Sequence, residues 1–439
     1  MGKLAILGGE KAIKSNYVEY CKWPIITKEM EEKVLEILRK GAMSNIELTK
    51  EFEREYANLY GMKYGLCHNN GTAAIHSALF GLKIGKGDEV ICPSMTYWAS
   101  CLPVLSLGGT VIFADIDEES LCIDPNDIER HITDRTKAII VVHYAGYPAD
   151  MDRIMQLAKK YNLKVLEDCS HSHWCFYKGK LTGTFGDVSA FSLMSGKSFP
   201  IGEGGIMLTN DLEIYERAII FGHYERHSEV TLDYLKKGIG VPWGGYKYRI
   251  HQLSSAVGIV LIKIFKEIFE EIDKAMTYFC DLLDTLPGIK THRPPKNSNS
   301  TKGGWYASLA HYNKEELEGL SITRFCEALR AEGVSAYPGC NKPLHLHPLF
   351  QNIDIYNDGK PTVIRNSEKD IRSKIGSLPI SENIGKKVFS IPRFVKFDKK
   401  IIEEVFGAFE KVVKNYKELL KDDKGDPPTI GNWGLTFRI

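Results

Sequence analysis

The sequence has no excess of charge of either sign and no long hydrophobic run. Its 439 residues include 57 Lys and Arg and 56 Asp and Glu, which gives a formal net charge of +1. Nucleic acids attract proteins mainly through a basic excess, so we expect no nucleic-acid partner. No apolar run approaches the roughly 20 residues that span a bilayer. The opening residues, MGKLAILGGEKAIKSN, are too interrupted by Gly and Glu for a signal peptide, so we expect no membrane association.

The cysteines are not arranged for cross-links or for metal binding. There are ten, scattered along the chain, and no two form a Cys-x-x-Cys pair. Reduced thiols in a cytoplasmic protein fit this pattern better than a disulfide framework or a zinc site. His171 and His173 are two positions apart, but no third ligand stands near them, so we expect no metal.

Short β-rich runs alternate with helical patterns between about residues 56 and 210. The predicted strands lie within residues 89–95, 110–116, 138–146, 164–170, 188–193 and 204–210. Between them, segment 151–163 repeats apolar residues on one helical face, with its lysines on the other. This alternation predicts an α/β domain with a mostly parallel sheet covered by helices, whose ligand site lies beyond the carboxyl ends of the strands.

The pattern changes after residue 246. Residues 251–283 read as one long amphipathic helix, and the Pro-rich segment 291–304 is predicted to be a surface loop. We therefore expect an N-terminal segment and large domain over 1–250, a connecting helix over 251–285, a small C-terminal domain over 286–420 and a tail over 421–439. The tail ends in apolar residues that either dock on a neighbouring surface or fray, namely Trp433, Leu435, Phe437 and Ile439.

Three segments carry residues suited to chemistry. Asn70-Gly71-Thr72 stands where a helix begins, and the free N–H groups there can hold an anion such as a phosphate, although a simple capped helix has the same pattern. Glu167 and Asp168 end an apolar strand, where a carboxylate can hold a proton on a heterocyclic nitrogen or cap the next turn.

The third segment, AFSLMSGKSFPIGEGGIMLTN, places Lys197 on a tight glycine-rich loop after a β-run. Burial of a lysine lowers the pKa of its amine and frees the amine to attack a carbonyl carbon. Taken alone, the same pattern fits an ordinary surface lysine. The order and spacing of the three segments together favour the chemical interpretation.

In that order, the segments resemble the DegT/DnrJ/StrS family of pyridoxal-phosphate-dependent sugar aminotransferases. The strings that carry the resemblance are NNGTAAIHSAL, GDEVICPSMTYWAS, TKAIIVVHYAGYPADMD, KVLEDCSHSH, GTFGDVSAFS, GKSFPIGEGGIMLTND and YKYRIHQLSSAVG. The resemblance runs from about Trp23 to Lys417. It implies an aspartate-aminotransferase-like (fold type I) large domain with a mostly parallel central sheet, followed by a smaller C-terminal α+β domain.

The resemblance also implies the chemistry. Lys197 would hold pyridoxal 5'-phosphate as a Schiff base and then move the proton, Asp168 would pair with the pyridine nitrogen, and Tyr97 would stack on the ring. The expected reaction moves an amino group from glutamate or glutamine to a ketone of a sugar or cyclitol by a ping-pong mechanism. Family members are typically homodimers with shared active sites, so we expect a homodimer here.

Further cofactor contacts follow from the resemblance, with two departures. Gly71, Thr72 and Ser192 match phosphate-binding positions. His171 stands near the ring hydroxyl, where many members have Gln, and its proton state stays open. Lys247 replaces an Asn that in many members reaches the phosphate from the partner subunit. Both departures are similar to the branch that aminates cyclitols such as scyllo-inosose.

Other interpretations stay open. An aminotransferase for a nucleotide-linked keto sugar fits the same motifs. A 3-dehydratase for nucleotide-linked sugars fits less well, because those relatives have His in place of the lysine and Lys197 is intact. A non-catalytic protein that binds the cofactor as a sensor or scaffold would show no spectral change when an amino donor is added.

Overall fold

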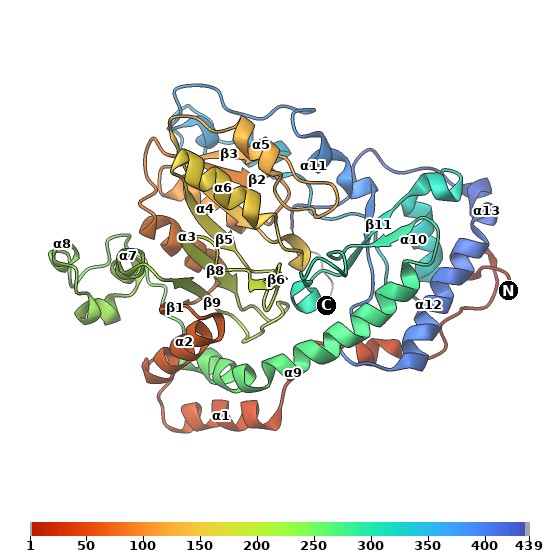
Figure 1. Cartoon of the computed structure of the whole chain (residues 1–439), viewed down its shortest axis with the longest axis horizontal. Coiled ribbons are helices and arrows are strands. Elements are labelled where there is room, and N and C mark those ends of the chain that lie inside the picture. Colours follow the sequence, from red (N-terminus) through yellow and green to blue (C-terminus); the bar gives the residue numbers. More distant parts are fainter. Residues whose placement is uncertain (1, 435–439) are drawn as a thin grey trace.

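A seven-stranded sheet forms the centre of the larger part of the molecule in the computed structural model, which describes residues 2–434 (Figure 1). Side by side, its strands are β1 (Tyr64–His68), β9 (Gly205–Thr209), β8 (Val188–Ser192), β5 (Lys164–Asp168), β4 (Thr136–Val142), β2 (Glu89–Pro93) and β3 (Thr110–Ala114). Strand β9 is antiparallel to both of its neighbours, and all other pairs are parallel. The predicted mostly parallel sheet is confirmed.

Strand β1 is the one strand of this sheet that the sequence did not predict. Its residues, Tyr-Gly-Leu-Cys-His, include a glycine and no β-branched side chain. Tertiary contacts decide its conformation, because it pairs along its whole length with β9 and lies under α2 (Glu47–Tyr60). A Cβ atom on Gly65 would lie 2.8 Å from the carbonyl oxygen of Glu53, so the glycine permits this close crossing.

Helices cover both faces of the sheet, which explains why every position of β2, β3 and β9 is buried. The remaining helices of this part are α1 (Lys28–Arg39), α3 (Gly71–Gly81), α4 (Leu102–Ser106), α5 (Pro125–Arg130), α6 (Met151–Tyr161), α7 (Leu212–Gly222) and α8 (Asp233–Lys236). Helix α6 is the predicted amphipathic helix, with Ile154 and Ala158 buried and Lys159 and Lys160 exposed. The pair α7 and α8 projects away from the second part of the molecule (Figure 1).

A single long helix, α9 (Gln252–Leu283), leads from the large sheet to the second part of the molecule, as predicted for residues 251–283 (Figure 1). No helix within residues 2–434 combines the length and the apolar character needed to cross a membrane. The second part holds the antiparallel strands β10 (Ile289–Thr291), β11 (Leu309–Tyr312) and β12 (Val388–Ser390). Its helices are α10 (Ile322–Ala331), α12 (Lys399–Lys414) and α13 (Tyr416–Leu419).

The chain returns to the large sheet between α10 and β12. Leu344, Phe350 and Leu378 of this return segment belong to the same hydrophobic core as the sheet. The short helix α11 (Pro379–Asn383) is fixed there by Asp115, whose carboxylate accepts two hydrogen bonds of 2.8 and 2.6 Å from the backbone and hydroxyl of Ser381. One segment of the C-terminal half of the chain thus packs on the large sheet of the N-terminal half. The predicted limits of the domains stay predictions.

The first residues of the described chain lie on the second part of the molecule. Leu4 and Tyr17 are buried in its core. The carboxylate of Glu332 accepts hydrogen bonds of 2.8 Å from the backbone N–H groups of Ala5 and Ala12. The first residues thus pack beside α10 and α12, far in sequence from their contacts (Figure 1).

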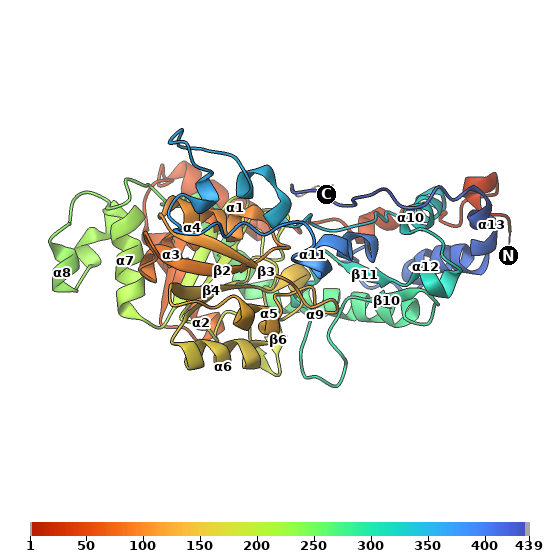
Figure 2. The same ribbon diagram turned by 90° about the horizontal axis from the view of Figure 1, so that it is seen from above.

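The described part of the C-terminal tail packs on the rest of the protein. Asp423 accepts hydrogen bonds from the backbone and hydroxyl of Ser321, and the tail then runs back from α13 toward the middle of the molecule (Figure 2). There the carbonyl of Asn432 accepts a hydrogen bond of 2.9 Å from Lys342, and the indole of Trp433 donates one of 3.2 Å to Pro343. Three of the apolar tail residues named above lie outside the described residues: Leu435, Phe437 and Ile439.

The prediction of a surface loop over 291–304 is only half right. Its middle, around Lys296 and Asn297, is exposed, but His292 and the stretch 302–305 are buried. The two small β6 (Phe176–Tyr177) and β7 (Lys180–Leu181) strands form a hairpin that the exposed middle contacts, with Thr301 accepting a hydrogen bond from Phe176. Because the segment is polar throughout, its composition did not indicate that its end is buried. That end lies against the loop of Lys197.

Candidate active site

The site lies at the carboxyl edge of the parallel strands, as the sequence predicted. Asp168 ends β5, Ser192 ends β8, and the two strands are neighbours. The first turn of α3 points at the same edge, because a Cβ atom on Gly71 would lie 2.7 Å from the Cβ atom of Ser192. Three stretches that are far apart in sequence therefore meet at one place.

The beginning of α3 is a closely packed turn with room only for backbone. The side chain of Asn70 accepts a hydrogen bond of 2.8 Å from the N–H of Ala73 and caps the helix. A Cβ atom on Gly205 would lie 2.4 Å from the carbonyl oxygen of Asn70, so this glycine lets β9 pass beside the turn. Thr72 follows in the first turn and is partly buried. The free N–H groups of such a turn can bind an anion.

Asp168 is buried and held by two hydrogen bonds. The hydroxyl of Ser100 donates to Oδ2 at 2.7 Å, and the N–H of Ser170 donates to Oδ1 at 3.0 Å. Ser100 is in turn 2.9 Å from the hydroxyl of Thr96. Tyr97 stands between these two residues in the chain and is partly buried, so the predicted stacking aromatic comes from the same segment that holds the predicted carboxylate.

Glu167, the other carboxylate that the sequence placed at this edge, faces away from Asp168 because side chains alternate along a strand. Its oxygens accept hydrogen bonds of 2.7 to 2.8 Å from three backbone N–H groups in residues 183–186. The remaining contact is a buried pair with His143 at 3.1 Å. Burial raises the pKa of Glu167, but these contacts outweigh burial and lower it overall. The same hydrogen bonds fix the loop after β7.

Lys197 is buried within the predicted glycine-rich loop between β8 and β9. Its exposed fraction is 4%, and burial lowers the pKa of its amine to about 8, with the charge of Asp168 acting in the opposite direction. The Nζ atom lies 3.2 Å from the hydroxyl of Tyr306 and 4.3 Å from the centre of its ring. With this pKa, roughly a tenth of the amine is uncharged at pH 7, far more than in an exposed lysine, and the uncharged form is the one that acts as a nucleophile.

His171 is buried beside the same tyrosine, with ring centres 4.5 Å apart. Burial and the nearby charge of Lys197 hold its pKa well below the usual value, so the imidazole is neutral. The N–H of Ala145 donates to its Nδ1 atom at 3.3 Å, which places the ring proton on Nε2. The imidazole therefore offers one N–H donor, as the amide of the more usual Gln would.

Several residues of this cluster were not predicted from the sequence. Tyr306 follows the buried end of the 291–304 segment, and Arg393 follows β12. The indole of Trp23 donates a hydrogen bond of 3.0 Å to the carbonyl of Lys197, and the guanidinium carbon of Arg393 lies 4.5 Å from the centre of that indole ring. All three come from segments with no motif, so only their position in space reveals them.

Lys247 lies apart from this cluster. The residue is exposed, and its Nζ atom lies 5.8 Å from the ring centre of Tyr224. Among the residues that the structure describes, no contact joins Lys247 to Lys197 or Ser192 within one chain. Its predicted phosphate contact from a partner subunit stays a prediction.

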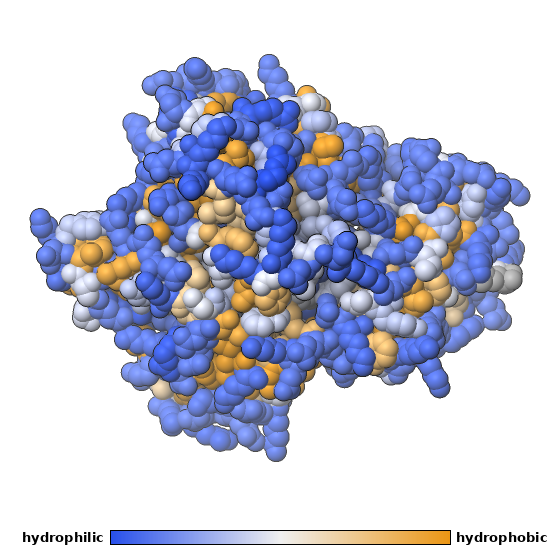
Figure 3. Space-filling model, in the orientation of Figure 1, coloured by the Kyte–Doolittle hydropathy of each residue, from blue (hydrophilic) through white to orange (hydrophobic). Residues whose placement is uncertain are grey.

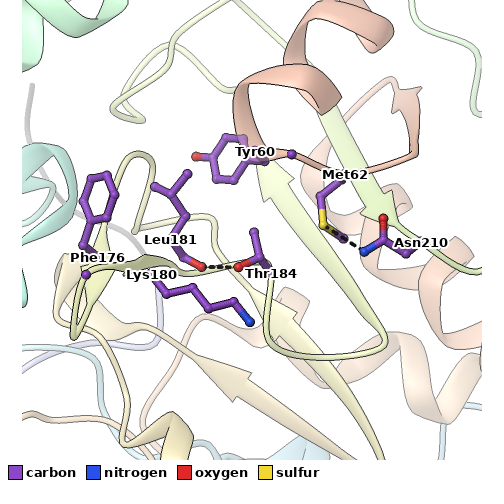
Figure 4. A pocket seen from close by; sticks show the side chains of 9 residues that line it. Tyr60, Met62, Phe176, Lys180, Leu181, Thr184 and Asn210 are labelled. Carbon is purple, nitrogen blue, oxygen red and sulfur yellow. Dashed lines mark hydrogen bonds between the residues drawn. The ribbon is translucent and has the colours of Figure 1, made fainter.

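A separate pocket of about 510 Å³ lies at the opposite edge of the sheet (Figure 4). Met62 precedes β1 and Asn210 follows β9, so both lie at the end of the sheet away from Asp168. Its other labelled side chains come from the end of α2 and the β6–β7 hairpin: Tyr60, Phe176, Lys180, Leu181 and Thr184. This pocket shares no residue with the lysine cluster.

The carboxyl edge of this α/β sheet carries a buried lysine, a buried carboxylate and a helix turn that can bind an anion. This combination is typical of an enzyme that works through a carbonyl cofactor. The chain belongs to the DegT/DnrJ/EryC1/StrS aminotransferase family, whose family model matches residues 24–410. The resemblance seen in the sequence is thereby confirmed. The protein is an aminotransferase, and pyridoxal phosphate is its cofactor.

Individual relatives cover nearly the whole chain. The chain is 35% identical over 397 residues to GDP-perosamine synthase of Escherichia coli O157:H7, covering 90% of this chain and 98% of that one. It is 28% identical over 432 residues to a putative L-glutamine:3-amino-2,3-dideoxy-scyllo-inosose aminotransferase of Micromonospora echinospora, covering 95% and 99%. The solved aminotransferase of Psychrobacter cryohalolentis is similar with a TM-score of 0.78 and 26% identity, covering 90% and 99%. The fold class is confirmed.

The residues of the site fit pyridoxal phosphate. The turn at Gly71 packs its backbone directly against Ser192, and the first turn of a helix offers backbone N–H groups to phosphate oxygens. Asp168 presents a buried carboxylate that can accept a hydrogen bond from a protonated ring nitrogen. The amine of Lys197 has the lowered pKa that a reaction with an aldehyde needs.

Proposed function

We propose that the protein transfers an amino group from glutamate or glutamine to a ketone of a sugar or a cyclitol, in two alternating half-reactions. The observation that carries this proposal is the buried amine of Lys197, whose pKa is lowered to about 8. The Micromonospora relative is named as an aminotransferase for L-glutamine and a scyllo-inosose, and the Escherichia coli relative is named as a synthase of GDP-perosamine.

We assign the chemical roles as follows. Pyridoxal phosphate, when bound, supplies an electron sink that lets the proton on the donor's α-carbon leave. Lys197 would hold the cofactor covalently, and its released amine would take the proton from the donor's α-carbon and later give a proton back. Asp168 keeps the ring nitrogen protonated, helped by the hydrogen bond from Ser100 that holds its own carboxylate in place. Tyr97 stacks on the ring.

The remaining assigned residues orient the cofactor. Gly71, Thr72 and Ser192 bind its phosphate through the first turn of α3 and the end of β8. The Nε2–H of His171 donates to the ring hydroxyl, a role that the neutral tautomer of this imidazole supports. None of the phosphate-binding residues assigned within one chain carries a charge.

We further propose that two chains form a homodimer through the projection of α7 and α8 and the segment that follows. Val241 and Trp243 are 72% and 44% exposed there, and Figure 3 shows hydrophobic side chains gathered on this end of the molecule. Apolar side chains at this exposure favour burial against a second copy. Lys247 lies in the same segment, so its ammonium would reach the phosphate of the partner's site.

A complementation experiment tests the shared site. Chains with Lys197→Ala would be mixed with chains carrying Lys247→Ala under conditions that exchange subunits. If Lys247 serves the other subunit, the mixed dimer contains one intact site and regains activity that neither variant has alone. A mixture that stays as inactive as its parts would contradict this arrangement, as would a monomer in analytical ultracentrifugation.

The choice of acceptor is tested by a panel. The loaded enzyme would receive glutamate or glutamine together with scyllo-inosose, a nucleotide-linked 4-keto sugar or a keto sugar phosphate, with the aminated product detected by mass spectrometry. The 35% identity to GDP-perosamine synthase favours a nucleotide-linked keto sugar as the second candidate. No amino transfer to any acceptor, with a cofactor spectrum that donors leave unchanged, would contradict the proposed function.

The free thiols support a cytoplasmic location. All ten cysteines are unpaired, and eight of them are buried. Thiols that stay reduced in a folded protein fit a reducing compartment. Fractionation of cells that produce the protein, with the activity followed in each fraction, tests this proposal.

A further inference from the structure

The C-terminal tail lies along a segment of the chain that borders the active site. The backbone N–H of Lys342 donates a hydrogen bond of 2.9 Å to the carbonyl of Asn432, and Asn341 pairs with Asn432 in a parallel bridge. The family model matches the chain as far as residue 410, so the tail lies beyond it. The contacts of the tail are therefore separate from the motifs that define the family.

Glycines let the tail approach this segment closely. Gly431 has a φ of +101°, and a Cβ atom there would overlap the carbonyl oxygen of Cys340. A Cβ atom on Gly339 would lie 2.6 Å from the side chain of Ile430. Two backbones that pass at such a distance leave no room for a side chain, and the positive φ also favours glycine. The sequence of the tail is thus fitted to residues 339 and 340.

Residues 340–342 lie between the tail and Tyr144. The backbone N–H of Asn341 donates to the Tyr144 hydroxyl at 3.3 Å, and the side-chain oxygen of Asn341 accepts from that hydroxyl at 2.7 Å. The N–H of the next residue, Lys342, bonds to the tail instead. Because N–H groups of neighbouring residues in an extended chain point in opposite directions, the tail and Tyr144 occupy opposite sides of this segment.

Tyr144 lies in turn against His171. Its side chain is buried, and its ring centre lies 5.7 Å from that of the imidazole. The residue that follows it, Ala145, donates its N–H to His171 Nδ1 at 3.3 Å. This bond occupies Nδ1 as an acceptor and so places the ring proton on Nε2. The tautomer of His171 therefore depends on where Tyr144 and Ala145 are held.

Ala145 has a backbone conformation that needs support from its surroundings. Its φ of 52° and ψ of 24° lie in the left-handed region, which residues with a Cβ atom rarely adopt. Such a conformation persists where neighbouring contacts fix it. The two hydrogen bonds between Tyr144 and Asn341 fix the residue before it. Without them Ala145 can relax, and its N–H then turns away from His171.

We propose that the C-terminal tail is a positioning element of the active site, which acts through Asn341 and Tyr144 to hold the His171 imidazole in its Nε2–H tautomer. This inference rests on the proposed function, in which that N–H donates to the ring hydroxyl of the cofactor. It deepens the function because it names the residues that orient this donor. These residues act through His171 rather than on the reacting groups.

The tautomer of His171 in the cofactor-free protein gives the direct test. Nitrogen NMR would be recorded on protein with 15N-labelled histidine, and the signals that disappear in His171→Ala would be assigned to this residue. In the wild type we expect one shift of an unprotonated Nδ1 and one of a protonated Nε2. Tyr144→Phe and Asn341→Leu each remove the 2.7 Å hydrogen bond, so there the two shifts should move toward each other as the tautomers mix. If one of these variants does not fold, the other decides.

Two glycines provide a matched pair for the tail itself. Gly431→Val would place a side chain on the carbonyl of Cys340 and lift the tail, whereas a Cβ atom on Gly434 meets no atom within 4 Å. Hydrogen exchange at residues 339–344 reports on the tail, because the N–H of Lys342 loses its acceptor when the tail leaves. We expect exchange there to be roughly tenfold faster or more in Gly431→Val, with the same mixing of His171 tautomers. Gly434→Val should match the wild type in both measurements.

A double-mutant cycle tests whether the effect reaches the cofactor through His171. The Kd for pyridoxal phosphate should rise roughly two- to tenfold in Tyr144→Phe, the fold-change that corresponds to one hydrogen bond between neutral groups. In the His171→Ala background the same substitution should have no further effect. Tyr312→Phe is the control, because the hydroxyl of Tyr312 donates to Leu320 away from the site, and it should leave the Kd unchanged.

Three results would overturn the proposal. The first is that the His171 shifts keep their wild-type values in Tyr144→Phe and Asn341→Leu. The second is that they keep those values in Gly431→Val, whether or not exchange at residues 339–344 becomes faster. The third is that the effects of Tyr144→Phe and His171→Ala on the Kd simply add. If no acceptor receives an amino group but the His171 shifts respond to the tail, the proposed function fails and this inference stands.

Discussion

The Nζ atom of Lys197 lies 3.2 Å from the hydroxyl oxygen of Tyr306, a residue 109 positions further along the chain. The lysine comes from the loop after β8 of the large sheet, and the tyrosine from the segment that leads into β11 of the small one. The amine of Lys197 is therefore enclosed by both parts of the molecule. Its pKa depends on contacts that neither part makes alone.

Tyr306→Phe should shift the pH dependence of cofactor capture. The tyrosine oxygen accepts a hydrogen bond from the amine and so favours its charged form, and without it the pKa of Lys197 should fall below its value of about 8. A shift of up to about one pH unit corresponds to the ~1 kcal/mol of such a bond. The rate at which cofactor-free protein binds pyridoxal phosphate would be measured from pH 6 to 9.

The matched control is Tyr312→Phe. Tyr312 is also buried and donates a hydrogen bond of 2.9 Å to the carbonyl of Leu320, away from the site. Its loss should cost stability without moving the pH profile. An unchanged profile in Tyr306→Phe would show that the hydroxyl has no influence on the amine.

Lys197→Ala should abolish both the covalent attachment and the reaction. The variant retains the turn at Gly71 and the carboxylate of Asp168, so it should still bind the cofactor, but without the yellow, borohydride-sensitive absorbance. Turnover should fall by several orders of magnitude, because nucleophile and proton carrier are lost together. Retention of both absorbance and activity would place the covalent bond at another residue.

Asp168→Asn should separate binding from proton abstraction. The amide keeps the size of the carboxylate and one oxygen for Ser100, so loaded enzyme should form. It cannot hold a positive charge on the ring nitrogen, and the rate of α-proton loss, followed with α-deuterated glutamate, should fall by roughly two or more orders of magnitude. Equal rates in the variant and the wild type would remove this role from Asp168.

Gly71→Ala should weaken cofactor binding through a steric clash. The new Cβ atom would lie 2.7 Å from the Cβ and 2.9 Å from the Cα of Ser192, and this backbone cannot move without opening the turn that faces the phosphate. We expect the Kd for pyridoxal phosphate to rise at least tenfold, or about 1.4 kcal/mol. Gly85→Ala, where no atom lies within 4 Å of the new group, is the control and should leave the Kd unchanged.

Lys302→Met should stabilise the protein, most strongly in acid. Lys302 is 4% exposed, its one hydrogen-bond partner among the described residues is His292 at 2.9 Å, and burial lowers the pKa of its amine from 10.5 to about 7. Between those two values the unfolded chain binds more protons than the folded protein, so the free energy of unfolding rises with pH in that window. The penalty that Met removes is therefore complete below pH 7.

Urea unfolding measures this effect. At pH 6 we expect Lys302→Met to unfold with a free energy about 1–3 kcal/mol above that of the wild type, and the difference should shrink toward pH 9. Lys411→Met is the contrast, because Lys411 lies 2.9 Å from the buried carboxylate of Glu332 and its loss leaves that charge unpaired. A gain for Lys302→Met that does not vary with pH would mean that packing, not protonation, is responsible.

Local sequence was enough for the elements whose pattern and burial agree. The strands around β2, β3, β4 and β5 are continuous apolar runs because both faces of the sheet are covered, and α6 and α9 repeat apolar residues at helical spacing. β1 could not be predicted, since its conformation comes from pairing with β9. The buried end of the 291–304 segment was hidden for the same reason, because its partners are distant in sequence.

Short motifs predicted the candidate site residues Lys197, Asp168 and Gly71. Asp168 ends a strand, Gly71 begins a helix and Lys197 lies in the loop after a strand, so chain order alone predicts that they lie at one edge of the sheet. The proton on His171 Nε2 and the contact between the Tyr306 hydroxyl and Lys197 depend on packing between separate segments of the chain and on the burial that this packing creates. Local periodicity does not indicate such contacts, because their partners are distant in the sequence. A shifted pKa and a fixed tautomer arise only when the folded chain buries the group and places its partners beside it.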